Sequence, residues 1–540
     1  MVYVDGARRD TSKRCLPGTR DGLLSEIKHW IDNTEEDVPG VLWLSGTAGK
    51  GKSAIAHTIA NWFLERGDPG ACFCFDRTRE VEHRHEKIIS TIAHDLADRD
   101  PIVRRALTST VHNDNELRRT KDTIRQWKRL VLGPMGVASQ AVAAPVLMVI
   151  DALDESGEAP SRERILQMLA GKLDPDSSEP MKLSTNIRIL VTSRLLNDIS
   201  VELNAAPHVR HISMDDLLAE STENDICLYV SKKLAGPRTA FKDEHFKELA
   251  QKADGLFEWA RLACEYIKGM KKAGVDPMDR FEDVIAGTSE SQIGTHLLDD
   301  MHHRILTENM PEDTKAMARV RSVMAQILAS LEPLYMSALT AMRRHFTGVS
   351  SSYKVELVMW PLGSLFAGTS DSHTPIRPLH ASFFDFLTDG SRSKKFFIDK
   401  SLASIGLAFG SLRVMKAGLH FNICSLESSY LSNSAIPDLE QRVKESIPPE
   451  LSYSCRFWGT HVRTIAFDLS LAKEVKAFLD DERLLFWLEV LSLMKGVGGS
   501  SATLSCIADW VQVRGLTTFL RLTDSRCVLV AGPCRVYGYR

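Results

Sequence analysis

A glycine-rich motif near the amino terminus constrains the fold more than any other feature of the sequence. Residues 46–53 read GTAGKGKS, which matches the pattern G-x-x-x-x-G-K-[ST]. The apolar run VLWLS comes directly before the motif, and the helical pattern Ala54–Leu64 comes directly after it. A strand, a tight glycine turn and a helix in this order are the opening unit of a parallel α/β sheet. The motif therefore predicts an α/β domain.

The same motif predicts a chemistry. Its glycines let backbone N–H groups turn toward bound phosphates, and the positive end of the following helix faces them. We expect Lys52 to reach the β- and γ-phosphates and Ser53 to offer its hydroxyl to Mg²⁺. The alternative is a chance glycine-rich turn. The predicted phosphate-binding residues are Gly46, Thr47, Ala48, Gly49, Lys50, Gly51, Lys52 and Ser53.

Acidic residues follow a later strand-like run. In VLMVIDALDE the apolar part ends at Asp151, and Asp154 and Glu155 come next. An acid at the carboxyl end of a parallel strand faces the crevice in which open α/β sheets bind ligands. We expect Asp151 to hold Mg²⁺ through water, and Asp154 or Glu155 to position an attacking water. In the competing interpretation, all three acids lie on a solvated turn.

An arginine follows another strand-like run. IRILVTS contains apolar strand residues, and Arg194 comes directly after it. The planar donors of a guanidinium match phosphate oxygens, and its charge persists at all ordinary pH values. We predict that Arg194 reads a γ-phosphate, and an ordinary surface arginine is the alternative.

Strands and helices alternate throughout the amino-terminal half. The five predicted strands are Val41–Ser45, Ala71–Phe75, Val146–Asp151, Ile187–Thr192 and Val209–Ser213. From Asp215 onward the pattern is helical, with a mixed stretch between Pro311 and Asp389 that is compatible with a winged helix. The expected fold class is an α/β P-loop NTPase core with a parallel five-stranded sheet, followed by helical, winged-helix and further helical domains.

Length and composition bound the organisation of the chain. At 540 residues it is too long for one hydrophobic core, so two to five compact units are expected. The net charge of -3 makes nucleic acid an unexpected main partner. The amino terminus lacks a secretory signal, and every apolar run is too short to span a bilayer. We therefore expect a cytoplasmic protein without membrane contact.

The ten cysteines occur without paired C-x-x-C spacing, which indicates reduced thiols. Cys72, Cys74, His83 and His85 supply the residue types of a zinc site, but their intervals fit no common finger pattern. The run GACFCF is also typical of a strand whose small apolar residues pack well. We interpret the two cysteines as core residues.

Taken in order, these segments resemble the NACHT family of signal-transducing (STAND) P-loop ATPases, and most of all its fungal, NLR-like branch. The resemblance runs from about Cys15 to Ala508. It rests on CLPGTRDGLLSEIKHWI, GTAGKGKS, VIDALDE, the TSR strand end, GLFEWARLACEYI and RPLHASFFDFLTD. The strand order of that family would place the Arg194 strand between the P-loop strand and the Asp151 strand.

The resemblance implies an ATP/ADP-dependent signalling switch that binds nucleotide with Mg²⁺, hydrolyses ATP slowly and assembles into a homo-oligomer in the ATP state. Such a switch implies an unknown protein effector and a role in fungal innate immunity or self/non-self recognition. Only the resemblance favours ATP over GTP. His380, in LHASF, is similar to a winged-helix histidine that senses ADP. A satisfied core histidine is the competing interpretation.

The predicted division of the chain follows from these segments. It comprises a lead-in (1–37), the NACHT P-loop domain (38–214), a helical domain (215–290), a winged-helix-like domain (291–395), a C-terminal helical domain (396–523) and an irregular tail (524–540). Relatives in the fungal branch often carry WD repeats after the helical region and sometimes an amino-terminal effector domain. Neither is visible in this sequence.

Two other functions are compatible with the sequence. One is a nucleotide-binding scaffold without turnover. The other is a nucleic-acid-binding regulator that uses the winged-helix unit, with Arg118–Arg129 and Arg392–Lys395 as basic contacts. Both basic stretches are more simply solvated helix faces or loops.

Overall fold

The chain divides into two compact units. A computed structural model describes residues 10, 13–77, 87–118, 120, 122–139, 145–172, 183–235, 241–268, 276–286, 295–346, 354–369, 373–428 and 430–512. The first unit comprises residues 1–305 together with His380–Ser382, and the second comprises the remaining residues, 306–379 and 383–540.

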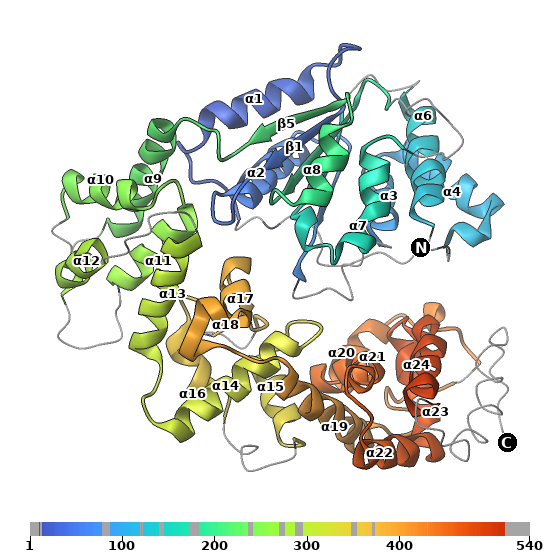
Figure 1. Cartoon of the computed structure of the whole chain (residues 1–540). Helices are drawn as coiled ribbons and strands as arrows, with labels where there is room; N and C mark the ends of the chain where they lie inside the picture. Colours follow the sequence, from blue (N-terminus) through green and yellow to red (C-terminus); the bar gives the residue numbers. More distant parts are fainter. Residues whose placement is uncertain are drawn as a thin grey trace. The chain divides into compact units, whose positions relative to one another are not determined.

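A five-stranded parallel sheet is the centre of the first unit (Figure 1). Its order is β2-β3-β4-β1-β5, and every neighbouring pair is parallel. The expected parallel five-stranded sheet is thus confirmed, and the strand that ends before Arg194 lies between the other two as expected. The strands are β1 (Val41–Ser45), β2 (Gly70–Cys74), β3 (Val146–Asp151), β4 (Ile187–Ser193) and β5 (Val209–Ser213).

The strand bounds differ little from those expected. β2 starts and ends one residue earlier than predicted, and β4 runs one residue further. Every residue of β1, β3 and β4 is buried, which explains why these strands read as continuous apolar runs. β5, at one edge of the sheet, is only partly buried.

Two apolar cores cover the two faces of the sheet. Successive strand residues point to opposite faces, so Leu42 and Leu44 enter one core while Trp43 enters the other. The first core includes residues of α1 (Asp21–Asp32) and α2 (Lys52–Glu65). The second includes residues of α3 (Ile88–Arg99), α4 (Pro101–Asn113), the π-helix Trp127–Leu132, α6 (Gly133–Ser139), α7 (Ala159–Leu169) and α8 (Asn197–Asn204). The sheet is therefore the middle layer of three.

Helices replace strands after β5, as the sequence pattern predicts. In the first unit, α9 packs against α10 and α11, and α11 packs against α12. These helices are α9 (Ala219–Leu234), α10 (Asp243–Lys252), α11 (Phe257–Lys268) and α12 (Pro277–Ala286). The division between the two units falls within α13 (Thr295–Asn309).

The described part of the second unit is mainly helical. Its small two-stranded antiparallel sheet pairs β6 (Phe366–Ala367) with β7 (Arg377–Pro378). The winged-helix interpretation of this stretch and the finer domain bounds stay predictions. The helices are α14 (Thr314–Ala329), α15 (Met336–Arg343), α16 (Glu356–Met359), α17 (Ala381–Thr388), α18 (Gly390–Ser393), α19 (Ser401–Gly418), α20 (Leu439–Ser446), α21 (Pro449–Arg463), α22 (Leu469–Asp480), α23 (Arg483–Leu493) and α24 (Ser500–Gln512).

In the second unit, helices α19 and α21 pack against each other. Across the described residues, none of the helices combines the length and the apolar character needed to cross a bilayer. No disulfide joins the cysteines in the same part of the chain.

Candidate functional site

The motif Gly46–Ser53 forms the turn between β1 and α2, at the carboxyl edge of the sheet. Two of its glycines are required by the backbone. Gly51 has φ of +95°, a conformation that residues with a Cβ rarely adopt, and it directly precedes α2. At Gly46, an added Cβ would lie 2.8 Å from the Cβ of Met214. The turn therefore depends on glycine at both ends.

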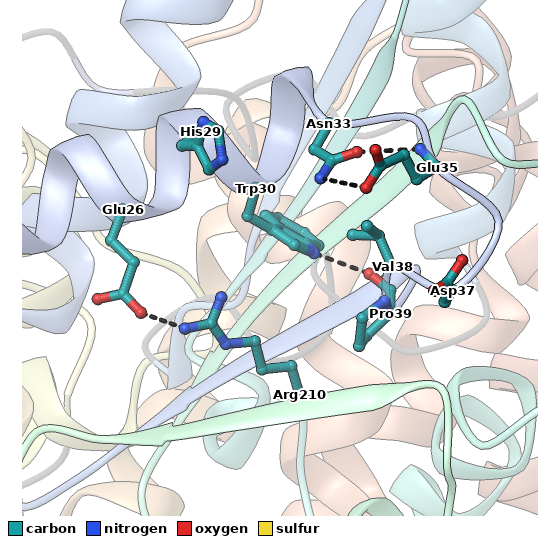
Figure 2. Close-up of a pocket in the computed structure, with 9 residues that line it drawn as sticks. All are labelled: Glu26, His29, Trp30, Asn33, Glu35, Asp37, Val38, Pro39 and Arg210. Atoms are coloured by element: carbon teal, nitrogen blue, oxygen red, sulfur yellow. Dashed lines mark hydrogen bonds and ion pairs between the residues drawn. The ribbon is translucent and has the colours of Figure 1, made fainter.

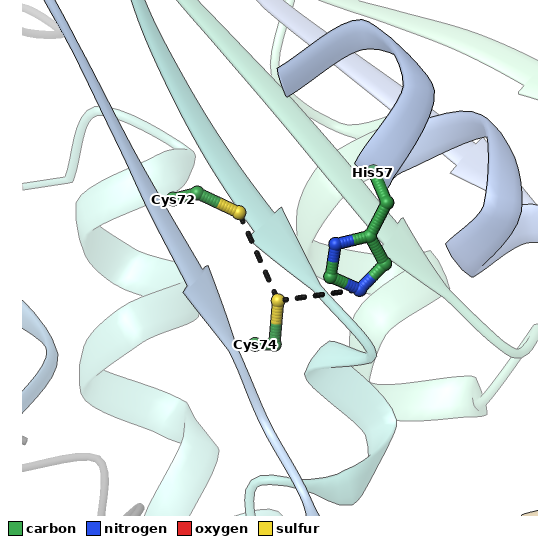
Figure 3. A group of neighbouring side chains, drawn as sticks. All are labelled: His57, Cys72 and Cys74. Atoms are coloured by element: carbon green, nitrogen blue, oxygen red, sulfur yellow. Dashed lines mark hydrogen bonds between the residues drawn. The ribbon is translucent and has the colours of Figure 1, made fainter. Parts of the chain in front are cut away.

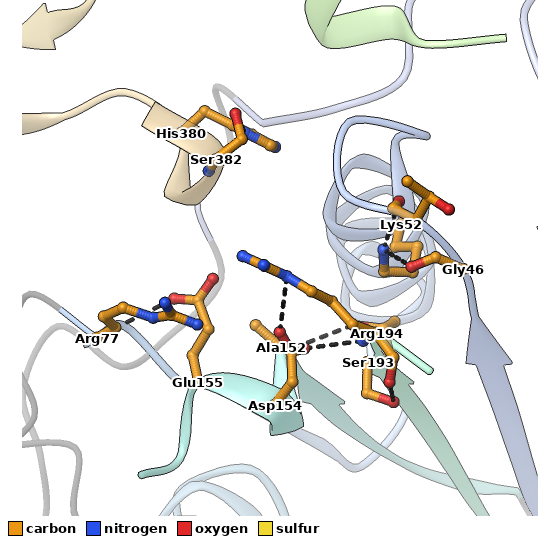
Figure 4. A network of polar contacts seen from close by, with 12 residues as sticks. Gly46, Lys52, Arg77, Ala152, Asp154, Glu155, Ser193, Arg194, His380 and Ser382 are labelled. Atoms are coloured by element: carbon orange, nitrogen blue, oxygen red, sulfur yellow. Dashed lines mark hydrogen bonds and ion pairs between the residues drawn. The ribbon is translucent and has the colours of Figure 1, made fainter. Parts of the chain in front are cut away.

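Lys52, the first residue of α2, folds over this loop (Figure 4). Its Nζ donates to the carbonyl of Gly46 at 2.6 Å and to that of Thr47 at 3.0 Å. Burial lowers the pKa of Lys52, and the carboxylate of Asp154 opposes that shift. Ser53, the next residue of α2, is half-buried. Both of these hydrogen-bond acceptors are neutral carbonyls, so neither cancels the positive charge of the amine. That charge can therefore attract an anion.

Asp215 binds the same loop from the residues after β5, and the sequence analysis did not single it out. Its Oδ2 accepts a hydrogen bond from the N–H of Thr47 at 3.0 Å, and its Oδ1 lies 3.6 Å from Nζ of Lys50. Lys50 and Lys52 thus point to different partners although they stand two residues apart. The only available signal was an acid two residues past the fifth predicted strand.

Asp151 ends β3 and is 3% exposed. Its Oδ1 accepts a hydrogen bond from the hydroxyl of Thr192 at 2.6 Å, and the same hydroxyl accepts from the N–H of Ala152 at 3.0 Å. Its Oδ2 lies 3.8 Å from Nε2 of His57, a residue of α2. The carboxylate is therefore oriented by a neighbouring strand and faces the P-loop helix.

The two acids after Asp151 have different environments, although the sequence treats them as equivalent. Asp154 Oδ1 accepts from the N–H of Arg194 at 3.0 Å, and Oδ2 lies 3.1 Å from Arg194 Nε. Glu155 instead accepts from the N–H of Arg77 at 3.2 Å. Burial, helped by the charge of Asp154, raises the pKa of Glu155 to about 7. Glu155 therefore changes charge near neutral pH.

Arg194 lies at the end of β4, between the P-loop strand and the strand of Asp151. Figure 4 shows its side chain extending beside Asp154, with the charged end continuing past the carboxylate. The sheet therefore gathers the predicted groups on β1, β3 and β4 at one edge, because the ends of adjacent parallel strands lie side by side.

His380 is far from the P-loop in sequence, but His380–Ser382 belong to the compact unit that contains it. The ring Nδ1 accepts a hydrogen bond from the N–H of Ser382 at 3.2 Å, and it lies 2.7 Å from the Ser382 hydroxyl. Burial lowers the pKa of His380, an effect that Glu258 opposes. A neutral ring whose Nδ1 accepts from an amide carries its proton on Nε2, which leaves Nε2 as a donor.

Two further contacts hold the P-loop backbone, and neither was predicted. The N–H of Glu258, in α11, donates to the carbonyl of Gly49 at 3.1 Å. Arg20, which precedes α1, donates through Nη2 to the carbonyl of Lys50 at 3.3 Å and through Nη1 to Thr222 at 2.9 Å. The lead-in and the helices after β5 therefore contact the loop directly.

A separate hollow of about 260 Å³ lies at the other end of β1 (Figure 2). Trp30 crosses it and donates to the carbonyl of Pro39 at 2.7 Å, and Arg210 is paired with Glu26. Its remaining lining residues are His29, Asn33, Glu35, Asp37 and Val38. Because β1 runs from this hollow toward the P-loop, the two sites lie at opposite ends of the strand.

One family model matches part of the amino-terminal half of the chain. A family model described as Nephrocystin 3, N-terminal, matches residues 18–194. That stretch runs from the residues before α1, through the P-loop and Asp151, to Arg194. No curated protein matches the chain at a significant level.

Solved structures with partial similarity to the chain include the following three. The Aeropyrum pernix ORC2 protein, solved as ADPNP–ADP complexes, is 14% identical over 67% of this chain and 91% of that one, with a TM-score of 0.33. A Walker-type ATPase of Pyrococcus abyssi is 10% identical over 70% and 98%, with a TM-score of 0.32. C. elegans PCH-2 is 13% identical over 52% and 70%, with a TM-score of 0.28.

Proposed function

We propose that this chain is an ATP/ADP-dependent signalling switch of the NACHT type, which binds nucleotide with Mg²⁺ and hydrolyses ATP slowly. The observation that carries the proposal is the convergence of three adjacent strand ends: β1 leads to Lys52, β4 to Arg194 and β3 to Asp151. An amine, a guanidinium and a carboxylate at one edge are the groups that a triphosphate with Mg²⁺ requires.

The roles divide among these residues. Backbone N–H groups of Gly46–Ser53 and the Lys52 amine would hold the phosphates, while Ser53 and Asp151 would hold Mg²⁺. Asp154 is committed to Arg194, so Glu155 is the better candidate to position the attacking water. In this assignment, Asp154 acts by holding Arg194 toward the γ-phosphate.

His380 supports the switch proposal through its tautomer. The Ser382 amide keeps Nδ1 as an acceptor, so Nε2–H is available to a phosphate oxygen. The lowered pKa keeps the ring neutral, so it contributes a hydrogen bond rather than a charge. A neutral donor fits a sensor of bound ADP.

The contacts to the P-loop backbone could link nucleotide binding to the conformation of the lead-in and of α11. Gly49 is bonded to α11, and Lys50 is bonded to Arg20 of the lead-in. A ligand shifts a conformational equilibrium only by its differential affinity, and near-complete reversal needs about 5.5 kcal/mol. We infer that bound phosphates favour a loop conformation in which these two contacts are weaker.

Substitution of the two loop lysines tests the binding proposal. Lys52→Ala should weaken binding of a fluorescent ATP analogue by roughly 10- to 100-fold, because a hydrogen bond to a charged group contributes about 1.5–3 kcal/mol. Lys50→Ala is the matched control, since Lys50 belongs to the same loop but its amine lies 3.6 Å from Asp215, and the change should lower affinity far less. If Lys52→Ala binds ATP as tightly as the parent protein, the assignment fails.

Turnover distinguishes a switch from a nucleotide-binding scaffold. Glu155→Gln should keep nucleotide affinity and abolish most phosphate release, whereas the parent protein releases phosphate slowly. A parent protein that binds ATP and releases no phosphate would instead favour the scaffold.

The nucleic-acid alternative receives little support from the described residues. In the first basic stretch, Arg125 lies 2.8 Å from Asp114 and 3.3 Å from Glu116. Ion pairs within the protein reduce the positive charge available to phosphates. Measured affinity for duplex DNA across a salt series tests this, because phosphate contacts weaken steeply with added salt.

Several finer parts belong to the same proposal. These are the domain bounds expected from the sequence, assembly into a homo-oligomer in the ATP state, an unidentified effector, a cytoplasmic location and a role in fungal self/non-self recognition. Size distributions of the protein in ADP and in ATP test the assembly, which should increase in ATP.

A further inference from the structure

Three soft ligand groups converge between β2 and the P-loop helix (Figure 3). The Sγ atoms of Cys72 and Cys74 are 3.7 Å apart, and Cys74 Sγ lies 3.7 Å from Nε2 of His57. The ligand atoms of all three side chains lie within 4.8 Å of one another. Two thiols and an imidazole are the groups that zinc prefers in proteins.

The local sequence explains this convergence. Cys72 and Cys74 alternate with Phe73, so both cysteines point to one face of β2 while the phenylalanine enters the opposite core. Cys72 is buried in the core that contains α2, and Cys74 is half-buried against the same core. His57 follows Ser53 by one turn of α2, which places it on the same side of the helix.

A carboxylate stands beside these three groups. Cys74 is in register with Asp151 on the neighbouring strand β3. The Oδ2 of Asp151 lies 3.8 Å from His57 Nε2, and its other oxygen is bonded to Thr192. Two sulfurs and one nitrogen therefore come together from β2 and α2, and a carboxylate oxygen of β3 lies beside the nitrogen.

The separations fit one tetrahedral ion. With Zn–S of about 2.3 Å, two sulfurs on a tetrahedral Zn²⁺ lie about 3.8 Å apart, and a sulfur and a nitrogen lie about 3.6 Å apart. The corresponding distances here are both 3.7 Å. The Cys72–Cys74 and Cys74–His57 separations therefore need little change on coordination.

We propose that His57, Cys72 and Cys74 bind a divalent cation of the zinc type, and that Asp151, whose Oδ2 lies 3.8 Å from His57 Nε2, moves toward the ion to become the fourth ligand. The site differs from the one that the sequence alone offered, because His57 replaces His83 and His85. Those two histidines lie outside the described residues.

Coordination would change the protons of the site. The contact with Cys72 and burial raise the pKa of Cys74, so this thiol is protonated without metal. The N–H of Asp10 donates to His57 Nδ1 at 3.0 Å, which puts the proton of a neutral ring on Nε2. Metal binding at Nε2 would move that proton to Nδ1 and break the Asp10 contact. Deprotonation of the thiols would release about two protons per ion.

Asp151 links this site to the nucleotide. A zinc-type ion that engages Oδ2 would draw the carboxylate away from Mg²⁺, and phosphate release would slow. That consequence rests on the proposed function, whereas the cation site itself does not.

Cobalt titration of the full-length, reduced protein tests the site without nucleotide. Co²⁺ should produce a thiolate-to-cobalt charge-transfer band, and Zn²⁺ should displace the cobalt and abolish that band. Cys72→Ser, Cys74→Ser and His57→Asn should each weaken Co²⁺ binding by more than about 100-fold, because even loss of an outer partner costs 10- to 100-fold. Cys264→Ser is the matched control, since it removes a buried cysteine of α11, and it should retain the band.

Either of two results would overturn the proposal. One is a parent protein that shows no cobalt–thiolate absorption, a result that needs no variant to fold. The other is a band that persists in folded Cys72→Ser and Cys74→Ser proteins, with folding verified by circular dichroism. Failure of nucleotide binding would leave the titration unaffected, so the two proposals are tested separately.

Discussion

Asp154 and Arg194 contact each other twice, once through the backbone and once through the side chains. Asp154 Oδ1 accepts from the N–H of Arg194 at 3.0 Å, and its Oδ2 lies 3.1 Å from Arg194 Nε. Asp154 is 8% exposed, so water compensates little for the loss of either contact. The pair fastens the residues after β3 to the end of β4 and fixes the direction of the guanidinium.

Removal of this carboxylate should destabilise the protein. We expect Asp154→Ala to lower the free energy of unfolding by about 1–3 kcal/mol, because a poorly hydrated N–H and a guanidinium lose their acceptor. Urea denaturation at neutral pH measures the change. Glu158→Ala removes an exposed acid nearby and should stay within about 0.5 kcal/mol of the parent. Equal stability of the two variants would contradict the role of the pair.

Glu155 should give phosphate release an acidic limit near neutral pH. Its pKa is about 7, and only the ionised carboxylate can accept a proton from water. The rate should therefore fall as the pH decreases through about 7. Rates of phosphate release measured across this pH range test the expected decrease. Glu155→Gln should remove this pH dependence together with most of the activity. A rate that stays level down to pH 5 would exclude Glu155 as the base.

The same carboxyl should affect stability with the opposite sign. Its pKa rises from 4.5 to about 7 in the folded state, so folded protein holds more protons than unfolded protein between those values. The free energy of unfolding should therefore contain a contribution that is present below pH 4.5 and is lost as the pH rises to about 7. Denaturant midpoints at several pH values, compared between the parent and Glu155→Gln, measure it. A difference that does not vary with pH would contradict the raised pKa.

Thr192 should be needed to orient Asp151. Its hydroxyl donates to Asp151 Oδ1 at 2.6 Å and accepts from the N–H of Ala152. We expect Thr192→Val to destabilise the protein by about 1–3 kcal/mol, because a buried carboxylate and a backbone N–H both lose a partner. It should also raise the Mg²⁺ concentration needed for turnover. Thr192→Ser keeps the hydroxyl and should behave like the parent in both assays.

Much of this architecture could be predicted from local patterns. Continuous apolar runs predicted β1, β3 and β4 because both faces of a central parallel strand are buried. The motif at Gly46–Ser53 carries its own geometry, since the glycines are needed for the turn whatever surrounds it. Asp151 and Arg194 could be predicted because each stands at the end of an apolar run. The strand order then predicts that they lie at the same edge of the sheet.

The remaining site residues depend on contacts between distant segments. Arg20 is buried and adopts φ of +61°, yet nothing around GTRDG predicts that it will reach the carbonyl of Lys50. Asp154 and Glu155 are adjacent acids, and only the position of β4 commits one of them to Arg194. His57 reads as one residue of an amphipathic helix until β2 is placed beneath it. These partners are set by tertiary packing, which local periodicity does not encode.

Arg20 should be irreplaceable by lysine. Its guanidinium contacts Thr222 and Lys50, and its backbone N–H donates to Asp225 at 3.1 Å. A lysine amine lacks the planar fork that reaches two acceptors at once. We expect Arg20→Lys to lower the free energy of unfolding by about 1–3 kcal/mol and to weaken nucleotide binding. Arg14→Lys changes an exposed arginine paired with Glu65, and it should leave both measurements close to the parent values.

A buried histidine should limit the acid stability of the helical second unit. In that unit, the Tyr453 hydroxyl accepts from the N–H of Leu331 at 3.1 Å and lies 2.7 Å from His461 Nε2. His461 is 3% exposed, and burial lowers its pKa from 6.5 to about 4. Unfolded chains therefore bind a proton on this ring below about pH 6.5, whereas folded chains do not until about pH 4. Stability should decrease across that interval.

The pKa shift of His461 sets the size of this loss of stability. Between pH 7 and pH 5, protonation of unfolded His461 should cost about 2 kcal/mol of stability, since each pKa unit corresponds to about 1.4 kcal/mol. His461→Asn should remove that part of the pH dependence, although it lowers stability at every pH by disturbing Tyr453. His420→Asn removes an exposed histidine and should leave the slope unchanged. Urea denaturation midpoints of the parent and the variants at both pH values measure the effect. If the pH dependence of stability persists in His461→Asn, it must come from other groups.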